Sequence, residues 1–268
     1  MNPVKVSVIM GVYNDEKFVT DAIQSILNQT YTNFEFIICD DCSKDSSPNV
    51  IETFAQKDPR IVILHNSTNQ GLATSLNNCI AVANGEYIAR MDSDDVALPI
   101  RLQEEVSFLD SHPEYAVVGA QVEYINNNSE PYRTSNFATD ISTTDVIHRV
   151  SVVHPTTMIR KSVIDEVHGY TVNKMTRRAE DYDLWCKIVE KGYALHNLDK
   201  ILLKYREDTV SFKKRKYEYR IDEFNIKNYW RKRMHYSIIH FPYAFKPLII
   251  GLIPKFIIFK MRKIKQEG

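Results

Sequence analysis

Short apolar runs alternate with amphipathic segments over roughly the first 110 residues of the chain. Runs rich in β-branched and aromatic residues predict strands at 4–10, 34–39, 61–64 and 86–91. Apolar residues at helical spacing predict helices at 16–28, 45–56 and 72–83. Alternation of this kind predicts an α/β fold, in which helices cover both faces of a mostly parallel sheet.

The pattern changes after Pro99. Helices are expected at 101–111 and 180–191 and a strand at 115–124, while the elements between 130 and 180 are short and polar. The 268 residues suit one large domain with a short appendage. Short polar elements inside such a domain are typical of a region that shapes a variable binding pocket.

Polar residues follow three of the predicted strands at their carboxyl ends. They lie at 11–14, at Asp40 and Asp41, and at 92–95. Ligands of open α/β sheets bind beyond the carboxyl ends of the strands. We therefore expect the three segments to converge at one edge of the sheet and to form the functional site.

Three carboxylates, those of Asp92, Asp94 and Asp95, stand within four residues directly after a buried strand. Their mutual repulsion favours a cation or hydrogen-bond donors between them. Mg²⁺ and Mn²⁺ prefer oxygen ligands, need few carboxylates, and fill their other positions with water or phosphate oxygens. A solvated acidic turn that caps the next helix is the alternative. The position at a strand end, facing two other polar strand ends, favours a metal site.

A carboxylate at the end of the second strand, such as that of Asp41, can accept hydrogen bonds from a ribose or from a uracil-type base. The alternative for Asp40 and Asp41 is an Asx turn that leads into the next helix. Cys39 and Cys42 flank this pair with the spacing of a redox motif, but the carboxylates between them disfavour a reactive thiolate. The four cysteines of the chain therefore indicate a reduced cytosolic protein.

Several segments together resemble glycosyltransferase family 2. The segment 6–14 is similar to the opening strand of that family, 23–31 to its first helix, and 35–45 to its base-binding segment. Segments 69–71, 84–88 and 92–95 follow in the order of the family. The resemblance is dense from about residue 4 to 110 and patchy to about 208, and Cys42 departs from it, standing where the family usually has Gly or Asn.

The resemblance implies a GT-A fold and inverting transfer from a nucleoside-diphosphate sugar, with a UDP-sugar expected. It implies that the donor is bound by Val12, Tyr13, Asn14, Asp41, Gly71 and Asp92. It also implies that Mn²⁺ or Mg²⁺ lies on Asp94, with Asp92 or Asp95 assisting. The departing diphosphate gains negative charge, which a divalent ion on its oxygens would stabilise.

The same resemblance divides the chain into parts. Residues 1–212 are expected to form the catalytic domain, with 1–110 as the nucleotide-sugar-binding half and 111–212 as the acceptor-binding half. Residues 213–268 are expected to form a basic, amphipathic helical tail.

Glu180 and Asp181 resemble a later acidic motif of the family. By this resemblance Asp181 is the base that takes the proton of the acceptor hydroxyl as it attacks opposite the diphosphate. Helix capping is the alternative, because acidic residues are favoured in a first turn. His154 resembles a family segment that lines the acceptor side, and a packed histidine is the alternative there.

Charge is distributed unevenly along a chain whose net charge is zero. Residues 213–268 hold 15 lysines and arginines against four acidic residues, so the body is acidic and the tail is basic. Zero net charge argues against nucleic acid as a partner. Apolar residues with basic flanks at 245–265 predict a helix at an anionic membrane surface. The alternative is that the tail docks on the body or on a second copy of the chain, as in a homodimer.

These features predict a metal-dependent glycosyltransferase that adds a hexose or N-acetylhexosamine to a glycan of the cell surface, with a polyprenyl-diphosphate-linked acceptor. No segment reaches the roughly 20 apolar residues of a membrane-spanning helix, and no signal peptide begins the sequence. The expected location is therefore the cytoplasm, at the inner face of the membrane. Two alternatives are a sugar-nucleotide nucleotidyltransferase and a sugar-nucleotide-binding module without catalysis. The first would need a basic, glycine-rich loop at 11–16, and Asp92, Asp94 and Asp181 argue against the second.

Overall fold

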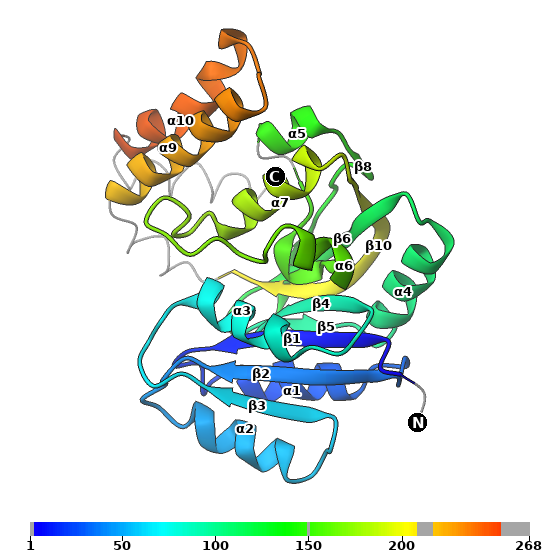
Figure 1. Ribbon diagram of the computed structural model, residues 1–268. Coiled ribbons are helices and arrows are strands. Elements are labelled where there is room, and N and C mark those ends of the chain that lie inside the picture. Colours follow the sequence, from blue (N-terminus) through cyan, green and yellow to red (C-terminus); the bar gives the residue numbers. More distant parts are fainter. Residues whose placement is uncertain (1–2, 149–150, 208–216, 253–268) are drawn as a thin grey trace.

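A computed structural model describes residues 3–148, 151–207 and 217–252 of the protein (Figure 1). The strands are β1 (Val6–Val12), β2 (Phe34–Asp40), β3 (Ile61–His65), β4 (Tyr87–Asp92), β5 (Val96–Ala97), β6 (Tyr115–Ile125), β7 (Pro131–Thr134), β8 (Asp140–Ile141), β9 (Met158–Arg160) and β10 (Ala194–Arg206). The α-helices are α1 (Val19–Leu27), α2 (Ser47–Ala55), α3 (Leu72–Val82), α4 (Arg101–Ser111), α5 (Thr143–Ile147), α6 (Lys161–Glu166), α7 (Glu180–Glu190), α9 (Glu218–Arg233) and α10 (Phe241–Leu252). Two 3-10 turns, η1 (His154–Thr156) and η2 (Ile238–His240), complete the described elements.

One mixed sheet runs through the body in the order β3-β2-β1-β4-β9-β6-β10-β5, with β7 beside β6 and β8 beside β10. Strands β3, β2, β1 and β4 are parallel to one another, as are β6 and β10. The short strand β9 runs antiparallel to both β4 and β6 and joins the two parallel sets. The expected α/β fold with a mostly parallel sheet is confirmed.

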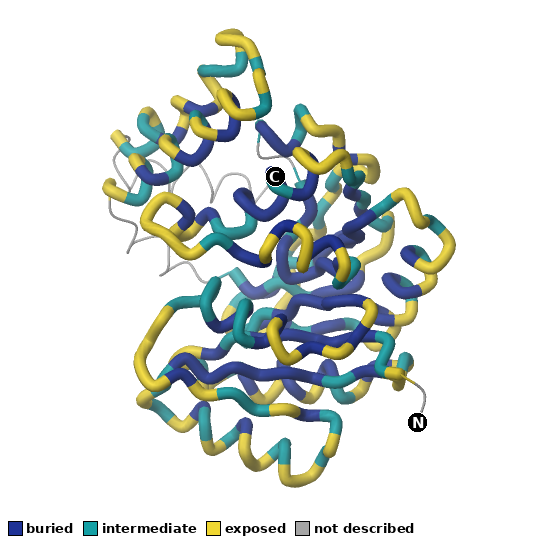
Figure 2. Tube along the Cα trace, in the orientation of Figure 1, coloured by how far each residue is buried: buried dark blue, intermediate teal, exposed yellow. Residues whose placement is uncertain are grey.

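Side chains of successive strand residues point to opposite faces of the sheet, and each face has its own core. Ile9, Ile37 and Ile88 pack with residues of α3, α6 and α7 on one face. Their neighbours Val8, Phe36 and Ala89 pack with residues of α1, α2 and α4 on the other. Strands β1, β2, β4 and β6 are buried along most of their length, whereas α1, α2 and α4 each combine buried and exposed residues (Figure 2).

The strand register brings the predicted polar segments together. In β1, Gly11 lies opposite Cys39 of β2 and opposite Asp92 of β4, and Val12 lies opposite Asp40. The carboxyl ends of the three strands therefore lie side by side, as the sequence predicted.

Most predicted elements are present with shifted ends. The first helix begins at Val19 rather than Glu16, because the preceding loop is bound elsewhere: the Asp15 amide donates to Ser47 and the Glu16 amide to Asp45. The sequence analysis did not predict β10, whose 13 residues include several polar side chains and register shifts against β6.

Helices α9 and α10 pack on each other at the top of Figure 1, outside the sheet. The buried Trp230 connects α9 to the body, since its Nε1 donates a hydrogen bond to Asp183 Oδ1 of α7 at 2.8 Å. Within the expected tail, α9 and α10 are helical. Residues 213–216 and 253–268 of that tail lie outside the described residues. Of the described helices, none is both long and apolar enough to cross a membrane.

The contact between α9 and α7 predicts a stability effect. Trp230→Phe preserves most of the packing but leaves the buried Asp183 Oδ1 without its donor, while Asp183 Oδ2 already lacks a hydrogen bond among the described residues. We expect the free energy of unfolding to fall by about 1–3 kcal/mol, as measured by urea denaturation. Tyr217→Phe, at an exposed position of the same tail, should change it by less than about 0.5 kcal/mol.

Candidate active site

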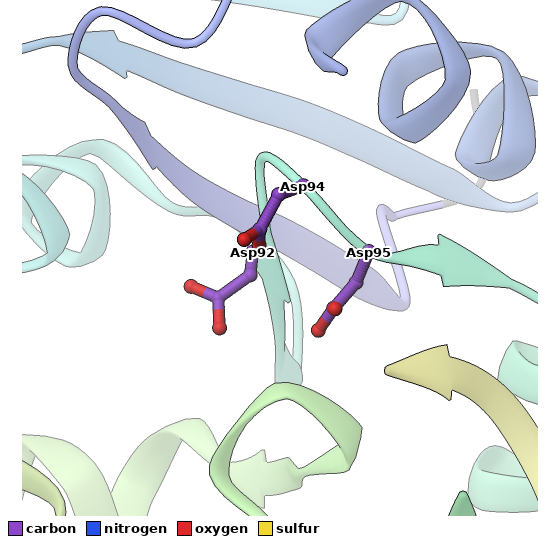
Figure 3. A group of neighbouring side chains, drawn as sticks. All are labelled: Asp92, Asp94 and Asp95. Carbon is purple, nitrogen blue, oxygen red and sulfur yellow. The ribbon is translucent and has the colours of Figure 1, made fainter. Parts of the chain in front are cut away.

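A cluster of three carboxylates lies on the turn between β4 and β5 (Figure 3). Asp92, Asp94 and Asp95 each offer an oxygen atom, and these atoms lie within 4.8 Å of one another. The sequence predicted this group, and the structure brings all three members together. Their spacing and their hard oxygen ligands fit a divalent ion that takes its remaining ligands from water or phosphate.

Asp94 carries the clearest electrostatic signature of the cluster. Burial, together with the nearby carboxylates of Asp92 and Asp15, raises the pKa of its carboxyl to about 7. An acid that holds its proton near neutral pH is one whose negative charge lacks compensation. A divalent cation would supply that compensation, so Asp94 fits the ligand role that the resemblance gave it.

Asp95 is held by the protein itself. It is 1% exposed, and its Oδ1 accepts a hydrogen bond from the amide of Arg206 on β10 at 2.7 Å. Arg206 also donates from Nε to the carbonyl of Asp94 at 2.8 Å. Asp95 Oδ2 is buried and has no hydrogen-bond partner among the described residues. One oxygen of Asp95 therefore fixes the turn to β10 and the other remains open to a cation.

A fourth carboxylate belongs to this edge and was missed by the sequence analysis. Asp15, in the loop after β1, accepts a hydrogen bond from Ser93 Oγ at 2.6 Å. Burial and the charges of Asp92 and Asp45 raise the pKa of Asp15. Its place directly after the first polar strand end was the sequence signal that could have identified it.

Two loops of the expected nucleotide side are bound to each other. Asn14, at a φ of 51°, donates from its amide to Ser43 Oγ and accepts from the Lys44 amide at its Oδ1. Glu16 in turn accepts from the Ser46 amide. Cys42 has a φ of 62°, in the left-handed region that Gly and Asn adopt readily. This conformation explains why Gly or Asn would be expected at a position where the chain has Cys.

Val12 and Tyr13 differ in accessibility. Val12 is buried in the sheet, whereas Tyr13 is 48% exposed at the carboxyl end of β1. An exposed aromatic ring at this edge can stack on a planar base. The side chain of Val12 is buried, so any contact of this residue with a ligand would come from its backbone at the end of β1.

Asp41 organises the loop before α3. Its carboxylate accepts hydrogen bonds from the Gln70 amide, the Gly71 amide and the Asn66 side chain, each at 2.8 Å. Gly71 has a φ of 86°, and the space where a Cβ would stand is open. Asp41 and Gly71 therefore lie together, with most of the acceptor capacity of Asp41 used inside the protein.

Glu180 and Asp181 are the first two residues of α7, which packs on the same face of the sheet as α3 and α6. Asp181 Oδ1 accepts a hydrogen bond from the Tyr182 amide at 2.7 Å. Burial, together with the charge of Asp181, raises the pKa of Glu180 to about 7. The positive charge of the buried Arg90 on β4 offsets part of the pKa increase of both Glu180 and Asp94.

His154 is a packed histidine. It is 8% exposed, its Nε2 lies 2.7 Å from the Tyr170 hydroxyl, and its ring meets the edge of the Trp185 ring. Burial and the neighbouring Arg90 charge lower its pKa well below the usual range, so the imidazole is neutral. His154 therefore fits the alternative named in the sequence analysis, a histidine packed in the core.

The sheet and its acidic edge define an open α/β protein of the kind that binds ligands beyond its strand ends. Sequence comparison assigns it to a family. The sequence model named Glycosyl transferase family 2 matches residues 7–184. The chain belongs to this family.

Similar proteins include two that are named as glycosyltransferases. The glycosyltransferase-type protein EpsE of Bacillus subtilis strain 168 is 37% identical over 252 residues, covering 93% of this chain and 90% of EpsE. WfaP of Escherichia coli, named as a UDP-Glc:alpha-D-GlcNAc-diphosphoundecaprenol beta-1,3-glucosyltransferase, is 28% identical, covering 91% of this chain and 94% of WfaP.

Two solved structures share the fold. Residues 1–349 of TarS from S. aureus in complex with UDP-GlcNAc superpose with a TM-score of 0.68 at 21% identity, covering 92% of this chain and 71% of that one. The mannosyltransferase PcManGT from Pyrobaculum calidifontis, in complex with GDP-Man and Mn²⁺, superposes with a TM-score of 0.62 at 18% identity, covering 94% and 69%. These likenesses establish the GT-A type of fold that was expected.

The raised pKa of Asp94 predicts a pH-dependent stability of the metal-free protein. The folded protein binds the Asp94 proton more tightly than the unfolded chain, so stability is lost as the pH rises from about 4 to about 7. Asp94→Asn removes this loss. We expect it to stabilise the metal-free protein at pH 8 by up to about 4 kcal/mol and to have little effect at pH 4. Urea denaturation at both pH values measures the difference, and equal effects at the two values would contradict it.

Proposed function

We propose that the protein is an inverting, metal-dependent glycosyltransferase that moves a hexose or N-acetylhexosamine from a UDP-sugar to a lipid-linked glycan acceptor. The observation that carries this proposal is the cluster of three carboxylates at the carboxyl end of β4, whose oxygen atoms lie within 4.8 Å of one another. Such a cluster can hold the divalent ion that binds a donor diphosphate.

The donor is proposed to lie along the carboxyl ends of β1, β2 and β4. Tyr13 offers a ring for the base, while Val12, Asn14, Asp41 and Gly71 form the walls of this edge. The UDP-GlcNAc complex of TarS and the name of WfaP support a uridine nucleotide. In this division residues 1–110 bind the donor and 111–212 the acceptor, although both parts share one sheet.

A divalent ion, Mn²⁺ or Mg²⁺, is proposed on Asp94 and Asp92, with the open oxygen of Asp95 as a further ligand. Its chemistry would be to stabilise the negative charge on the departing diphosphate. The chain provides the carboxylates and fixes their turn through Arg206, so that the site is preformed. The Mn²⁺ bound in the PcManGT structure supports this proposal.

Asp181 is proposed as the base that accepts the proton of the attacking acceptor hydroxyl. It stands in the first turn of α7 next to Glu180, and one of its oxygens is bound by the Tyr182 amide. This hydrogen bond orients the carboxylate and leaves the second oxygen for the hydroxyl. Attack from the face opposite the diphosphate inverts the anomeric carbon.

The acceptor is proposed to be a polyprenyl-diphosphate-linked glycan of capsule, O-antigen or exopolysaccharide biosynthesis. The printed acceptor of WfaP is a diphosphoundecaprenol glycan, and this chain covers nearly all of WfaP. A sugar-nucleotide nucleotidyltransferase is disfavoured, because the loop after β1 presents Asp15 and Glu16 where a triphosphate would need cations.

Asp181→Asn tests the catalytic assignment. We expect the variant to bind UDP with Mn²⁺ as tightly as the wild type, because Asn preserves the size and the amide contact. Transfer to a lipid-linked acceptor should fall by about 10²–10⁴-fold, because the base is lost. Isothermal titration with UDP and a radiolabelled transfer assay give the two values. Loss of UDP binding together with transfer would show a structural role instead.

A peripheral place at the inner face of the membrane is proposed for the same enzyme. The hairpin of α9 and α10 presents exposed apolar residues, and Ile238, Ile239 and Leu252 are each 74% exposed. Exposed cations of this hairpin, Lys232 and Lys246 among them, complement anionic lipid at about 1 kcal/mol each. A polyprenyl carrier would present its sugar at this surface.

Replacing both Ile238 and Ile239 with Glu tests the membrane proposal. The double variant should sediment with vesicles of anionic phosphatidylglycerol at least about tenfold less than the wild type, because the exposed apolar residues are lost. Val62→Glu, at an exposed position of β3, is the matched control and should sediment normally. Unchanged sedimentation of the double variant, with a change from dimer to monomer in ultracentrifugation, would favour a subunit interface.

A further inference from the structure

Two neighbouring arginines precede the acidic first turn of α7. Arg177 and Arg178 are both exposed, and Asp181 follows Arg178 by three residues. Three residues of chain span at most about 11 Å. A group bound by these arginines would therefore lie close to the proposed catalytic base.

The pair of arginines is held on α9. The guanidinium carbons of Arg177 and Arg178 lie 4.6 Å and 5.1 Å from the centroid of the Tyr219 ring. Arg177 Nη2 also donates to Oδ2 of the buried Asp222 at 3.1 Å. Tyr219 and Asp222 are three residues apart on α9, so they share one side of that helix. The two arginines therefore connect the start of α7 to the hairpin of α9 and α10.

The charges of the two arginines are unequally compensated. Arg177 has the carboxylate of Asp222 as its partner, whereas the guanidinium of Arg178 makes no ion pair within the described part of the chain. Arg178 has a φ of 64°, a conformation that residues other than glycine rarely adopt. The loop around it is closed from within, since the Ala179 amide donates to the carbonyl of Thr176 at 2.8 Å. A preformed loop thus presents an uncompensated guanidinium.

A diphosphate is the anion that this arrangement fits best. A guanidinium offers parallel N–H groups that match two oxygens of a phosphate, and two adjacent arginines offer this fork twice. The order of groups in the protein also matches a lipid-linked acceptor. Asp181 comes first, then the arginines, then a hairpin with exposed apolar residues. In the acceptor, the sugar, the diphosphate and the prenyl chain follow one another in the same order.

We propose that Arg177 and Arg178 bind the diphosphate of a glycosyl-diphosphate-lipid acceptor and hold its sugar beside Asp181. Arg178 donates to one phosphate group with its free fork. Arg177 donates to the other with the N–H groups that Asp222 does not use, while the Tyr219 ring holds its side chain in place. The assignment of the ligand as the acceptor rests on the proposed function, whereas the binding of a diphosphate at this site does not.

Titration of the metal-free full chain with farnesyl diphosphate, in the presence of EDTA, tests the site without donor, metal or transfer. Arg178→Asn removes the charge but keeps a residue that tolerates a positive φ, so the fold should be retained. We expect its Kd to be at least about tenfold higher than that of the wild type, because charge-assisted hydrogen bonds are lost. Equal Kd values, or no binding to the wild type, would overturn the proposal.

Arg60→Gln is the matched control for this titration. Arg60 also lies over an aromatic ring, that of Phe34, and pairs with Asp58, but it stands at the amino end of β3. The carboxyl ends of the strands, where the site lies, are at the opposite edge of the sheet. The control variant should therefore bind farnesyl diphosphate as the wild type does.

Sedimentation with phosphatidylglycerol vesicles distinguishes the diphosphate of an acceptor from the phosphate of a membrane headgroup. Arg178→Asn should weaken vesicle binding by no more than about fivefold, the contribution of one cation near an anionic surface. A larger loss for vesicles than for farnesyl diphosphate would assign Arg178 to the headgroups and overturn the proposal.

Transfer kinetics test the role of the site in the proposed reaction. The two acceptors are a sugar on a short prenyl diphosphate and the same sugar on a neutral alkyl chain. Arg178→Asn should raise the KM for the first acceptor alone by about tenfold or more, with kcat and the KM for the UDP-sugar changed by less than about threefold. An equal increase for both acceptors would overturn the proposal. If the wild type transferred to neither acceptor, the proposed function would fail, while the titration would still decide the diphosphate site.

Discussion

The concentration of negative charge at the end of β4 is the constraint on which the rest of the site depends. Four carboxylates, those of Asp15, Asp92, Asp94 and Asp95, lie at one sheet edge where burial weakens their hydration. Two buried arginines compensate part of this charge: Arg90 pairs with Asp92, and the charge of Arg206 acts on Asp15 while its backbone amide binds Asp95. The remaining charge, centred on Asp94, is the charge that the proposed divalent ion would offset.

The fold supplies this edge through strand register. Gly11 and Val12 of β1 lie opposite Asp92 and Asp40 of its two neighbours, so that residues far apart in sequence share one rim of the sheet. The hydrogen bonds between the loop of Asn14 and the loop of Lys44 then fix the rim without help from a ligand. Part of the site is therefore held in place by bonds within the chain, a preorganisation that the proposed stabilisation of a leaving group would use.

The hydrophobic pattern of the sequence predicted the parallel half of the fold, because the strands there are continuous apolar runs. It also located the carboxylates of 92–95, because they directly follow such a run.

The pattern could not predict β10, because register shifts interrupt the alternation of side chains there. It could not predict the role of Arg206 either, because this residue binds Asp95 through its backbone amide. Arg90 was visible in the sequence as a cation within an apolar strand.

The antiparallel strand β9 has a consequence for motion. It is hydrogen-bonded to β4 on one side and to β6 on the other, so one continuous sheet passes beneath the proposed donor-binding and acceptor-binding halves. A hinge between the halves would have to break these strand pairs, in contrast to proteins whose domains close about a flexible linker. Access of the two substrates, and any order in which they enter, must therefore be governed by the segments above the sheet while the sheet itself stays fixed.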